Sequence, residues 1–323
     1  MVVTQTAADC RQSLFLAAFL YDTIYAWFLG RPRSIPLSTV HSTLSLDTKN
    51  DHNNTSMSAL HAWAGLCVQV AKVGDMFNAP LPLDLNALSQ IYATIRTFYY
   101  SLPPGLACTD SQMSSLDASA YALNTQFCAL QILLHRLPTR HRHAKQDLDP
   151  LENDEVVLPG FTQQESLGAI YVNAVRIARL VHFLVQIHGI EHIVPTILDN
   201  IFVAAVALIR HILRNTHQAS SQERDKLWLQ KLSNTLEAVQ KHYHMACGIR
   251  TTLFSIVETT PLAGIFKVGS CQRYSIKGGS EQTLSSPSLG DRGGHDGVMG
   301  DFTFEPSMMG VNWYPDAEFG ILV

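Results

Sequence analysis

The chain has 323 residues, of which 46% are hydrophobic and 15% are charged, and its formal net charge is −4 at pH 7. A chain of this length can bury a large core, whereas its slight negative charge excludes a general electrostatic attraction to nucleic acid. Its cysteines are too widely spaced to supply the paired thiolates of a structural zinc site, and we expect them to be reduced in an intracellular protein. They are Cys10, Cys67, Cys108, Cys128, Cys247 and Cys271.

A first helix is expected over residues 9–29, with a signal at each end. Asp9 can cap the first turn, and Gln12 stands at the spacing of a capping box. After the helix, Gly30 can adopt the left-handed conformation that ends a helix. Pro32 prevents the helix from continuing.

The apolar run over residues 14–29 contains one acid, Asp22. It is shorter than the ~20 residues that a membrane span needs, so we expect a core helix and no contact with a membrane. A buried carboxylate requires a partner. We therefore expect Asp22 to pair with a base, such as Arg31, or with a backbone donor, and not to act in catalysis.

Helical patterns continue to about residue 258, and there is no convincing strand alternation. Residues 34–55 are expected to form a polar connector, and residues 136–155 a solvated loop of mixed charge. Capping-box spacings mark three helix starts, at Ser114 with Asp117, Thr162 with Glu165, and Ser220 with Glu223. The expected helices are 9–29, 58–77, 84–100, 114–136, 162–186, 195–215 and 220–246, the last including His242 and His244. The chain is therefore predicted to be all-α, an array of about seven to eight packed helices.

The composition changes near residue 269. Residues 1–268 are expected to form one helical domain, and residues 269–323 a disordered, low-complexity tail rich in Gly, Ser and Pro. The last part, 301–323, sets aromatic side chains among acids and has no Lys or Arg. This composition is typical of an activation segment, and an arm that docks back on the helices is the alternative.

One short motif could bind a metal. His188, Glu191 and His192 match the H-x-x-E-H pattern of a class of zinc peptidases, in which the imidazoles bind the metal and the glutamate is the general base. The pattern needs one helix face, but Gly189 lies inside it and Pro195 follows it closely. A metal site at these residues is therefore the weaker alternative. No catalytic set is expected, and we predict that the chain is not an enzyme.

The first helix and the residues after it resemble the hallmark segment of a regulatory domain of fungal binuclear zinc-cluster transcription factors, the domain typified by xylanolytic activators. In that segment an aromatic-rich helix with an internal aspartate ends in Gly-Arg-Pro and an extended stretch. The matching residues in this sequence are Asp22, Gly30, Arg31 and Pro32.

Three later segments follow the same family pattern in the same order. Residues 121–136 end in a Leu-Leu-His-Arg sequence that includes His135 and Arg136, although Pro138 falls one residue later than in the family. Residues 170–184 resemble a middle helix and residues 229–250 the closing helix. The resemblance covers about residues 9–258.

The resemblance implies that residues 1–268 form an all-helical regulatory domain that takes part in transcription by RNA polymerase II in the nucleus. Its implied partners are the transcription machinery or regulatory proteins, with a small-molecule inducer as an implied ligand. DNA binding in the family belongs to an N-terminal zinc cluster of six closely spaced cysteines, which this sequence lacks. We therefore expect a domain truncated at its N-terminus, with no cofactor in this chain. The alternatives are a helical metal-dependent hydrolase and an interaction scaffold that has lost DNA binding.

Overall fold

The computed structural model describes residues 2–29, 32–46, 55–78, 84–148, 160–215 and 219–266. Within these ranges the chain forms nine α-helices, two short 3-10 helices and no strand. The predicted all-α fold is therefore confirmed, with nine helices where seven to eight were expected. The tail expected at 269–323 lies outside the described residues, as do Gly30 and Arg31 of the family signature.

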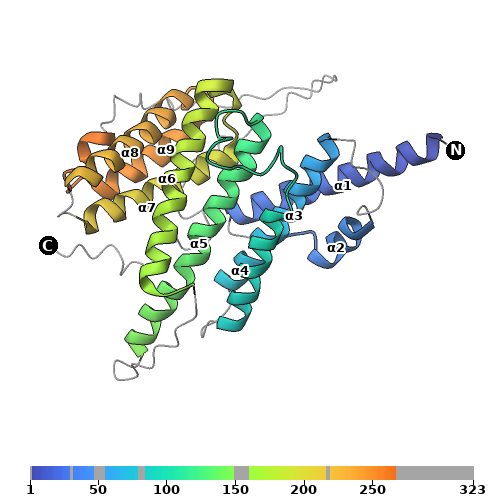
Figure 1. Ribbon diagram of the computed structural model, residues 1–323, viewed down its shortest axis with the longest axis horizontal. Coiled ribbons are helices and arrows are strands. Elements are labelled where there is room, and N and C mark those ends of the chain that lie inside the picture. The colour runs from blue at the N-terminus through green and yellow to red at the C-terminus, as the bar shows by residue number, and fades with distance from the viewer. Residues whose placement is uncertain are drawn as a thin grey trace, which may run out of the picture.

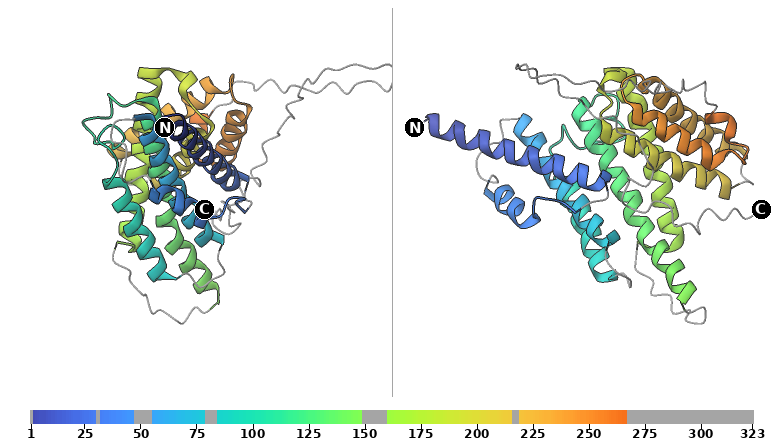
Figure 2. Two further views of the ribbon diagram at one scale, coloured as in Figure 1. Left: turned by 90° about the vertical axis from the view of Figure 1, so that its right-hand side faces the viewer. Right: turned by 180° about the vertical axis from the view of Figure 1, so that it is seen from behind.

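The helices pack around a central pair, α5 and α6, which lie side by side (Figures 1 and 2). Helices α7, α8 and α9 pack on one side of this pair, and α3 and α4 on the other. Helices α1 and α2 lie at the far end, against α3. The bounds are α1 (Val2–Leu29), α2 (Leu37–Leu46), α3 (Thr55–Asn78), α4 (Leu85–Tyr100), α5 (Ala118–Leu148), α6 (Gln163–His188), α7 (Pro195–Arg214), α8 (Ala219–Val239) and α9 (His244–Val257), with 3-10 turns η1 (Ile190–His192) and η2 (Ala263–Phe266).

The buried apolar side chains form two clusters of unequal size. The larger cluster runs through α3 to α9 and includes Tyr121, Leu130 and Ile201, all of which are fully buried. The smaller cluster, which we call the N-terminal cluster, joins α1, α2 and α3. Its buried members are Leu16, Phe19, Val40, Ala64, Cys67 and Val68.

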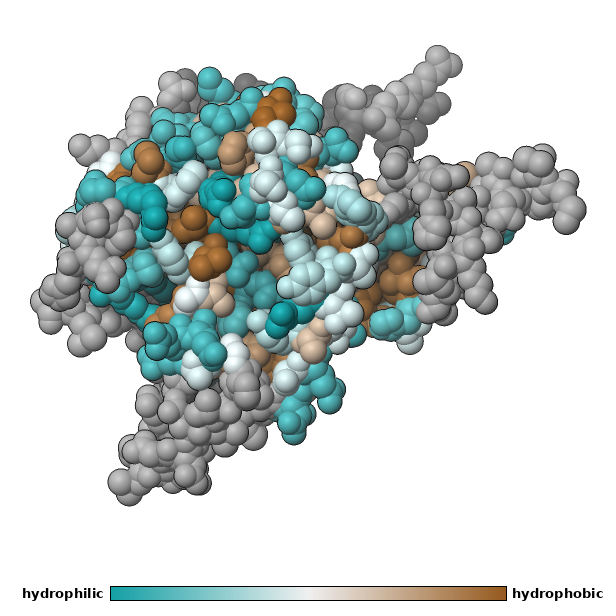
Figure 3. Space-filling view, viewed as in Figure 1, coloured by the Kyte–Doolittle hydropathy of each residue, from teal (hydrophilic) through white to brown (hydrophobic). Residues whose placement is uncertain are grey.

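Two helices of the larger cluster, α6 and α7, are long and apolar enough to cross a membrane by length and composition alone. Both contribute many buried residues to the core, where each packs against α5 and against the other. Such burial is expected of a core helix in a helical array. In the view of Figure 3, hydrophilic side chains cover most of the surface around scattered apolar ones.

Local capping signals place two helix starts where the sequence predicts them. The Thr162 hydroxyl accepts a hydrogen bond from the Glu165 backbone N–H at 3.2 Å, and the Glu165 carboxylate accepts one from the Thr162 N–H at 3.1 Å. This reciprocal capping box is confirmed. At the start of α4, Asp84 accepts hydrogen bonds from the N–H groups of Asn86 at 2.9 Å and Ala87 at 3.1 Å.

Two predictions at the N-terminal end are wrong. Helix α1 begins at Val2, so Asp9 lies inside the helix and does not cap it. The connector expected at 34–55 contains α2, because Leu37, Val40 and Leu44 recur at helical spacing and pack on the N-terminal cluster. The short apolar face is enough to form a helix once α3 covers it.

The start and the end of α5 also differ from the prediction. The helix begins at Ala118, so Ser114 is not its cap, and it continues to Leu148 through the region expected to be a loop. It passes through Pro138, which removes one backbone hydrogen bond. Leu134, Leu137 and Pro138 are all buried, so packing outweighs the local cost of the proline.

The last expected helix consists of two helices, α8 and α9, separated by the turn at 240–243. His242 lies in this turn and His244 begins α9, so the two histidines do not share one helix. The prediction failed because the apolar spacing stays in phase across the turn, where Leu236, Val239 and Ala246 are all buried. Helix α8 begins one residue before Ser220, its expected cap.

Four cysteines are free, as expected: Cys10, Cys67, Cys108 and Cys128. Burial raises the pKa of Cys67 and of Cys128 to about 12, so these thiols stay protonated and pack as small apolar side chains. Cys247 is disulfide-bonded, which contradicts the expectation of reduced thiols. Sequence spacing did not reveal this, since a disulfide joins residues that are neighbours in space.

Candidate functional site

The single acid in the apolar run of helix α1 binds the segment that follows that helix. Asp22 lies on α1, and its Oδ2 atom accepts hydrogen bonds from the backbone N–H groups of Ser34 and Ile35, both at 2.8 Å. The expectation of a backbone donor is therefore confirmed. The alternative partner, Arg31, lies outside the described residues. Pro32 is exposed and directly precedes the segment that Asp22 binds.

The same segment is also held on its other side. The Arg33 guanidinium donates to both carboxylate oxygens of Asp75 on α3, at 3.1 Å each, and to the Ala71 carbonyl at 3.2 Å. This is the two-pronged geometry in which arginine binds a carboxylate most specifically. Asp22 and Arg33 together tie the segment 32–35 to both α1 and α3. The role of Arg33 was not predicted, although a basic residue directly after Pro32 is visible in the sequence.

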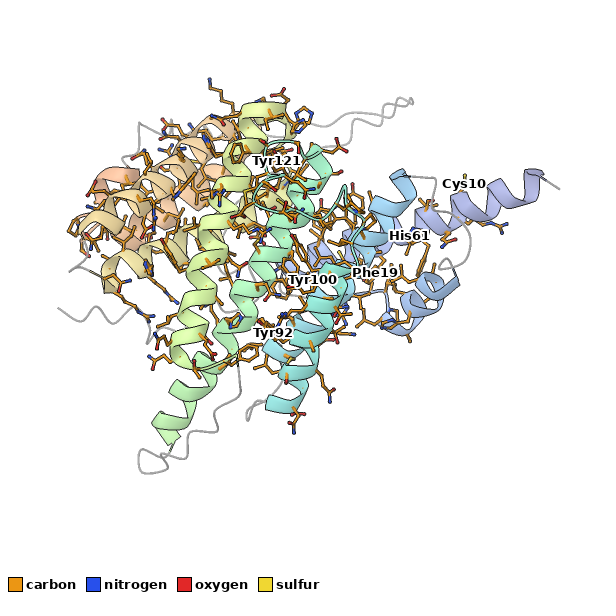
Figure 4. The ribbon with its side chains drawn as sticks, viewed as in Figure 1. Cys10, Phe19, His61, Tyr92, Tyr100 and Tyr121 are labelled. Carbon is orange, nitrogen blue, oxygen red and sulfur yellow. The ribbon has the colours of Figure 1, made fainter. Side chains whose placement is uncertain are left out.

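The second segment singled out by the family resemblance contributes to an aromatic packing site. His135 of α5 is buried between Tyr92, labelled on α4 in Figure 4, and Phe161, with ring centroids 5.5 and 4.8 Å away. Its Nδ1 atom lies 3.5 Å from the Ser166 hydroxyl of α6. Burial lowers the pKa of His135 to about 4, so the imidazole is neutral at pH 7. Arg136, the next residue, is partly buried.

The residues of the H-x-x-E-H motif do not share one helix. His188 is the last residue of α6, and its Nε2 atom donates a hydrogen bond to the Leu116 carbonyl at 2.8 Å. Gly189 has a positive φ of 93° and ends the helix, and Glu191 and His192 follow in η1. The Glu191 carboxylate lies 3.9 Å from His192 Nδ1, a contact between neighbours on the surface. The described residues contain no group of three or more side chains placed to hold a metal ion.

A partly buried polar junction, which the sequence did not reveal, connects α4, α5 and α6. The Tyr99 hydroxyl donates to the Asn124 side-chain oxygen at 2.8 Å and stacks its ring on Phe127 at 4.0 Å. Arg176 of α6 donates to the Tyr99 hydroxyl at 3.3 Å and to the Cys108 carbonyl. Burial raises the pKa of Tyr99, so its hydroxyl stays protonated as a donor.

A second unforeseen cluster joins α6, α7 and α8. Asp225 is 1% exposed, accepts a hydrogen bond from the Tyr171 hydroxyl at 2.8 Å and lies 3.7 Å from His211 Nε2. The rings of Tyr171 and His211 stack with centroids 3.9 Å apart. Burial lowers the pKa of His211 although Asp225 opposes the change, so the histidine is mainly neutral at pH 7. Arg224 also belongs to this cluster, since its Nε atom lies 4.0 Å from Asp225 Oδ1 and its guanidinium donates to the Tyr171 hydroxyl at 3.2 Å. The buried carboxylate is therefore surrounded by donors from the same chain, which is a packing role.

Three of the residues that the sequence singles out contact other parts of the same chain. Asp22 holds the backbone, His135 packs among aromatic rings, and His188 bonds to a carbonyl. Comparisons with models of protein families, with curated proteins and with solved structures found no match.

Proposed function

We propose that this chain is the regulatory domain of a fungal zinc-cluster-type transcription factor that acts in the nucleus on transcription by RNA polymerase II. In this proposal the chain has no catalytic activity and holds no cofactor of its own. It reaches DNA only through another domain. Its partners are the transcription machinery or regulatory proteins, and a small-molecule inducer is the proposed signal.

The observation that carries the proposal is the contact made by Asp22. The family signature places an internal aspartate before Gly-Arg-Pro, and here that carboxylate binds the backbone directly beyond Pro32. Such a contact fixes the conformation of the backbone. This role fits a residue pattern that is shared by domains without catalytic activity. The order of the four family-like segments along the chain gives the proposal its second support.

The proposed mechanism is a shift between two packings of the helical array. Helices α1 and α2 contact the rest of the described chain mainly through α3, and the contacts of Asp22 and Arg33 help to fix their position. A ligand or partner can shift such an equilibrium only by binding one packing more tightly than the other. An inducer that favours one position of α1 and α2 would therefore change which surface meets the transcription machinery.

The test is a reporter assay. The full chain is fused to a heterologous DNA-binding domain, and reporter output is compared with that of the DNA-binding domain alone at equal protein level. We expect the fusion to raise or lower output, and the fusion that lacks residues 269–323 reports whether the acidic-aromatic end is responsible. Unchanged output from a fusion that is nuclear and bound at its site would contradict the proposal. An interaction scaffold that has lost DNA binding would then be the better description of the chain.

Measurement of bound metal tests the alternative function, a metal-dependent hydrolase. The purified full chain is expected to contain no stoichiometric zinc, and His192→Ala is expected to leave its metal content unchanged. Stoichiometric zinc that disappears in His192→Ala would overturn the regulatory proposal as written. His41→Ala is a matched control, because His41 is exposed on α2, which contacts α1 and α3 at the other end of the described chain.

A further inference from the structure

Arg176 on α6 is a partly buried cation that contacts no carboxylate among the described residues. Its guanidinium donates to the Tyr99 hydroxyl at 3.3 Å and to the Cys108 carbonyl, which are both neutral acceptors. Its Nε atom is shielded from solvent and has no hydrogen-bond partner in the described chain. Removing a charge from water is costly unless an opposite charge compensates it. The described residues leave the charge of Arg176 without such compensation.

Other shielded arginines of this chain are paired with acids. Arg33, Arg179 and Arg250 have side chains that are 20%, 33% and 3% exposed. Each of these guanidinium groups lies within 3.4 Å of a carboxylate oxygen. Arg176 has a comparable environment but lacks this kind of partner, which indicates that an anion from outside the described chain completes its site.

A neighbouring guanidinium adds to the surplus of positive charge. Arg179 lies one turn beyond Arg176 on the same side of α6. Its acid, Asp110, belongs to the segment between α4 and α5, is 70% exposed and makes a single contact of 3.3 Å. Burial raises the pKa of both Tyr99 and Cys108, so neither side chain supplies a negative charge at pH 7. The two arginines therefore share one carboxylate, which leaves one positive charge in excess.

From these contacts we infer that Arg176, assisted by Arg179, binds a small organic molecule through its carboxylate or phosphate group. Guanidinium groups match both of these oxyanions in charge and in geometry. Arg176 is only partly exposed between α4 and α6, so a small group reaches it more readily than a folded protein surface does. A ligand of this class deepens the proposed function, on which this inference rests, because it gives the proposed inducer a chemical class and a binding point.

Thermal unfolding of the full chain at pH 7 tests this site. Sodium phosphate and sodium acetate are the probes, each compared with sodium chloride at the same ionic strength. We expect both anions to bind with a dissociation constant on the order of 1 mM, and thus to raise Tm by about 5 °C at about 0.1 M. Arg176→Gln should raise this constant at least about tenfold, which cuts the rise in Tm by about half or more.

Lys241→Gln is the control, because it removes one exposed positive charge from the turn between α8 and α9. It should keep the full rise in Tm, and it also accounts for the general stabilisation that phosphate gives to folded proteins. Arg179→Gln is a second variant in case Arg176→Gln does not fold, since the Arg179 side chain is more exposed than a core residue. It should weaken binding at least about threefold. Circular dichroism checks that every variant is helical.

A response to phosphate alone would assign a phosphate ester as the ligand, and a response to acetate alone a carboxylic acid. The inference is overturned if neither anion raises Tm more than chloride does. It is also overturned if Arg176→Gln and Arg179→Gln respond as fully as Lys241→Gln, since the anions would then be adventitious ions only. A fusion that regulates its reporter while the chain binds neither anion would keep the proposed function and remove only this site.

Discussion

The helices from α5 to α9 and the end formed by α1, α2 and part of α3 are held together in different ways. The first region shares one large core, in which Leu130, Ile201 and many other apolar side chains are fully buried. The second region has only the small N-terminal cluster, and polar contacts from Asp22 and Arg33 hold its connecting segment. Regions with fewer buried contacts open at lower free energy. The N-terminal end is therefore where a change of conformation costs least.

The largest effect is expected in the large core. Ile201→Ala on α7 removes a fully buried side chain and should lower the free energy of unfolding by about 2–5 kcal/mol. Urea unfolding followed by circular dichroism measures this loss. Val172→Ala, on the exposed side of α6, is the control and should change stability little. If both variants unfold alike, the large core is not the main source of stability.

The second-largest effect on stability is expected from the titration of His135. Its pKa is about 4 in the folded chain, below the ordinary value of 6.5, so the unfolded chain binds the proton first as the pH falls. Stability should therefore be greatest above pH 6.5 and fall between pH 6.5 and pH 4, by an amount on the order of 1–3 kcal/mol. His135→Phe should remove this part of the pH dependence. If the stability of that variant falls equally steeply with pH, another titratable group causes the effect.

Asp22→Ala should act only on the N-terminal end. It removes a carboxylate that accepts two backbone hydrogen bonds, at a cost of about 1–2 kcal/mol. Hydrogen exchange should become faster in α1 and α2 and stay unchanged in α6 and α7. Asp22→Asn keeps an acceptor oxygen and should show a smaller change. Faster exchange throughout the chain would mean that the two regions unfold as one unit.

The smallest effect is expected for the ion pair between Arg33 and Asp75. Asp75→Asn weakens a pair whose acid is 62% exposed, so its cost should be below about 1 kcal/mol and should shrink further in high salt. Denaturant unfolding at low and high salt measures this. A salt-independent loss would indicate that Asp75 acts through packing and not through charge.

Features with a local chemical cause could be predicted from the sequence. The capping box of Thr162 and Glu165 depends on residues within one turn and is confirmed, as is the helix start at residue 84. For Asp22, the need for a partner could be foreseen because a carboxylate on an apolar helix requires one, but a base and a backbone donor were both possible. Its actual partners, Ser34 and Ile35, depend on how the chain turns back after α1.

Features decided by distant packing could not be predicted in this way. Pro138 should end a helix by local rules, yet α5 continues, with Pro138 itself and the preceding Leu134 and Leu137 buried. The turn at 240–243 was missed because apolar residues on both sides keep helical spacing. The junction of Tyr99, Asn124 and Arg176 involves three helices, and no sequence motif marks residues so far apart.

The reporter assay with the full chain fused to a heterologous DNA-binding domain tests the proposed function most directly. The account predicts that the fusion changes reporter output relative to the DNA-binding domain alone, and that Asp22→Ala alters this change at equal protein level. Output equal to that of the DNA-binding domain alone, from a fusion that is nuclear and bound at its site, would contradict the proposal of a regulatory domain.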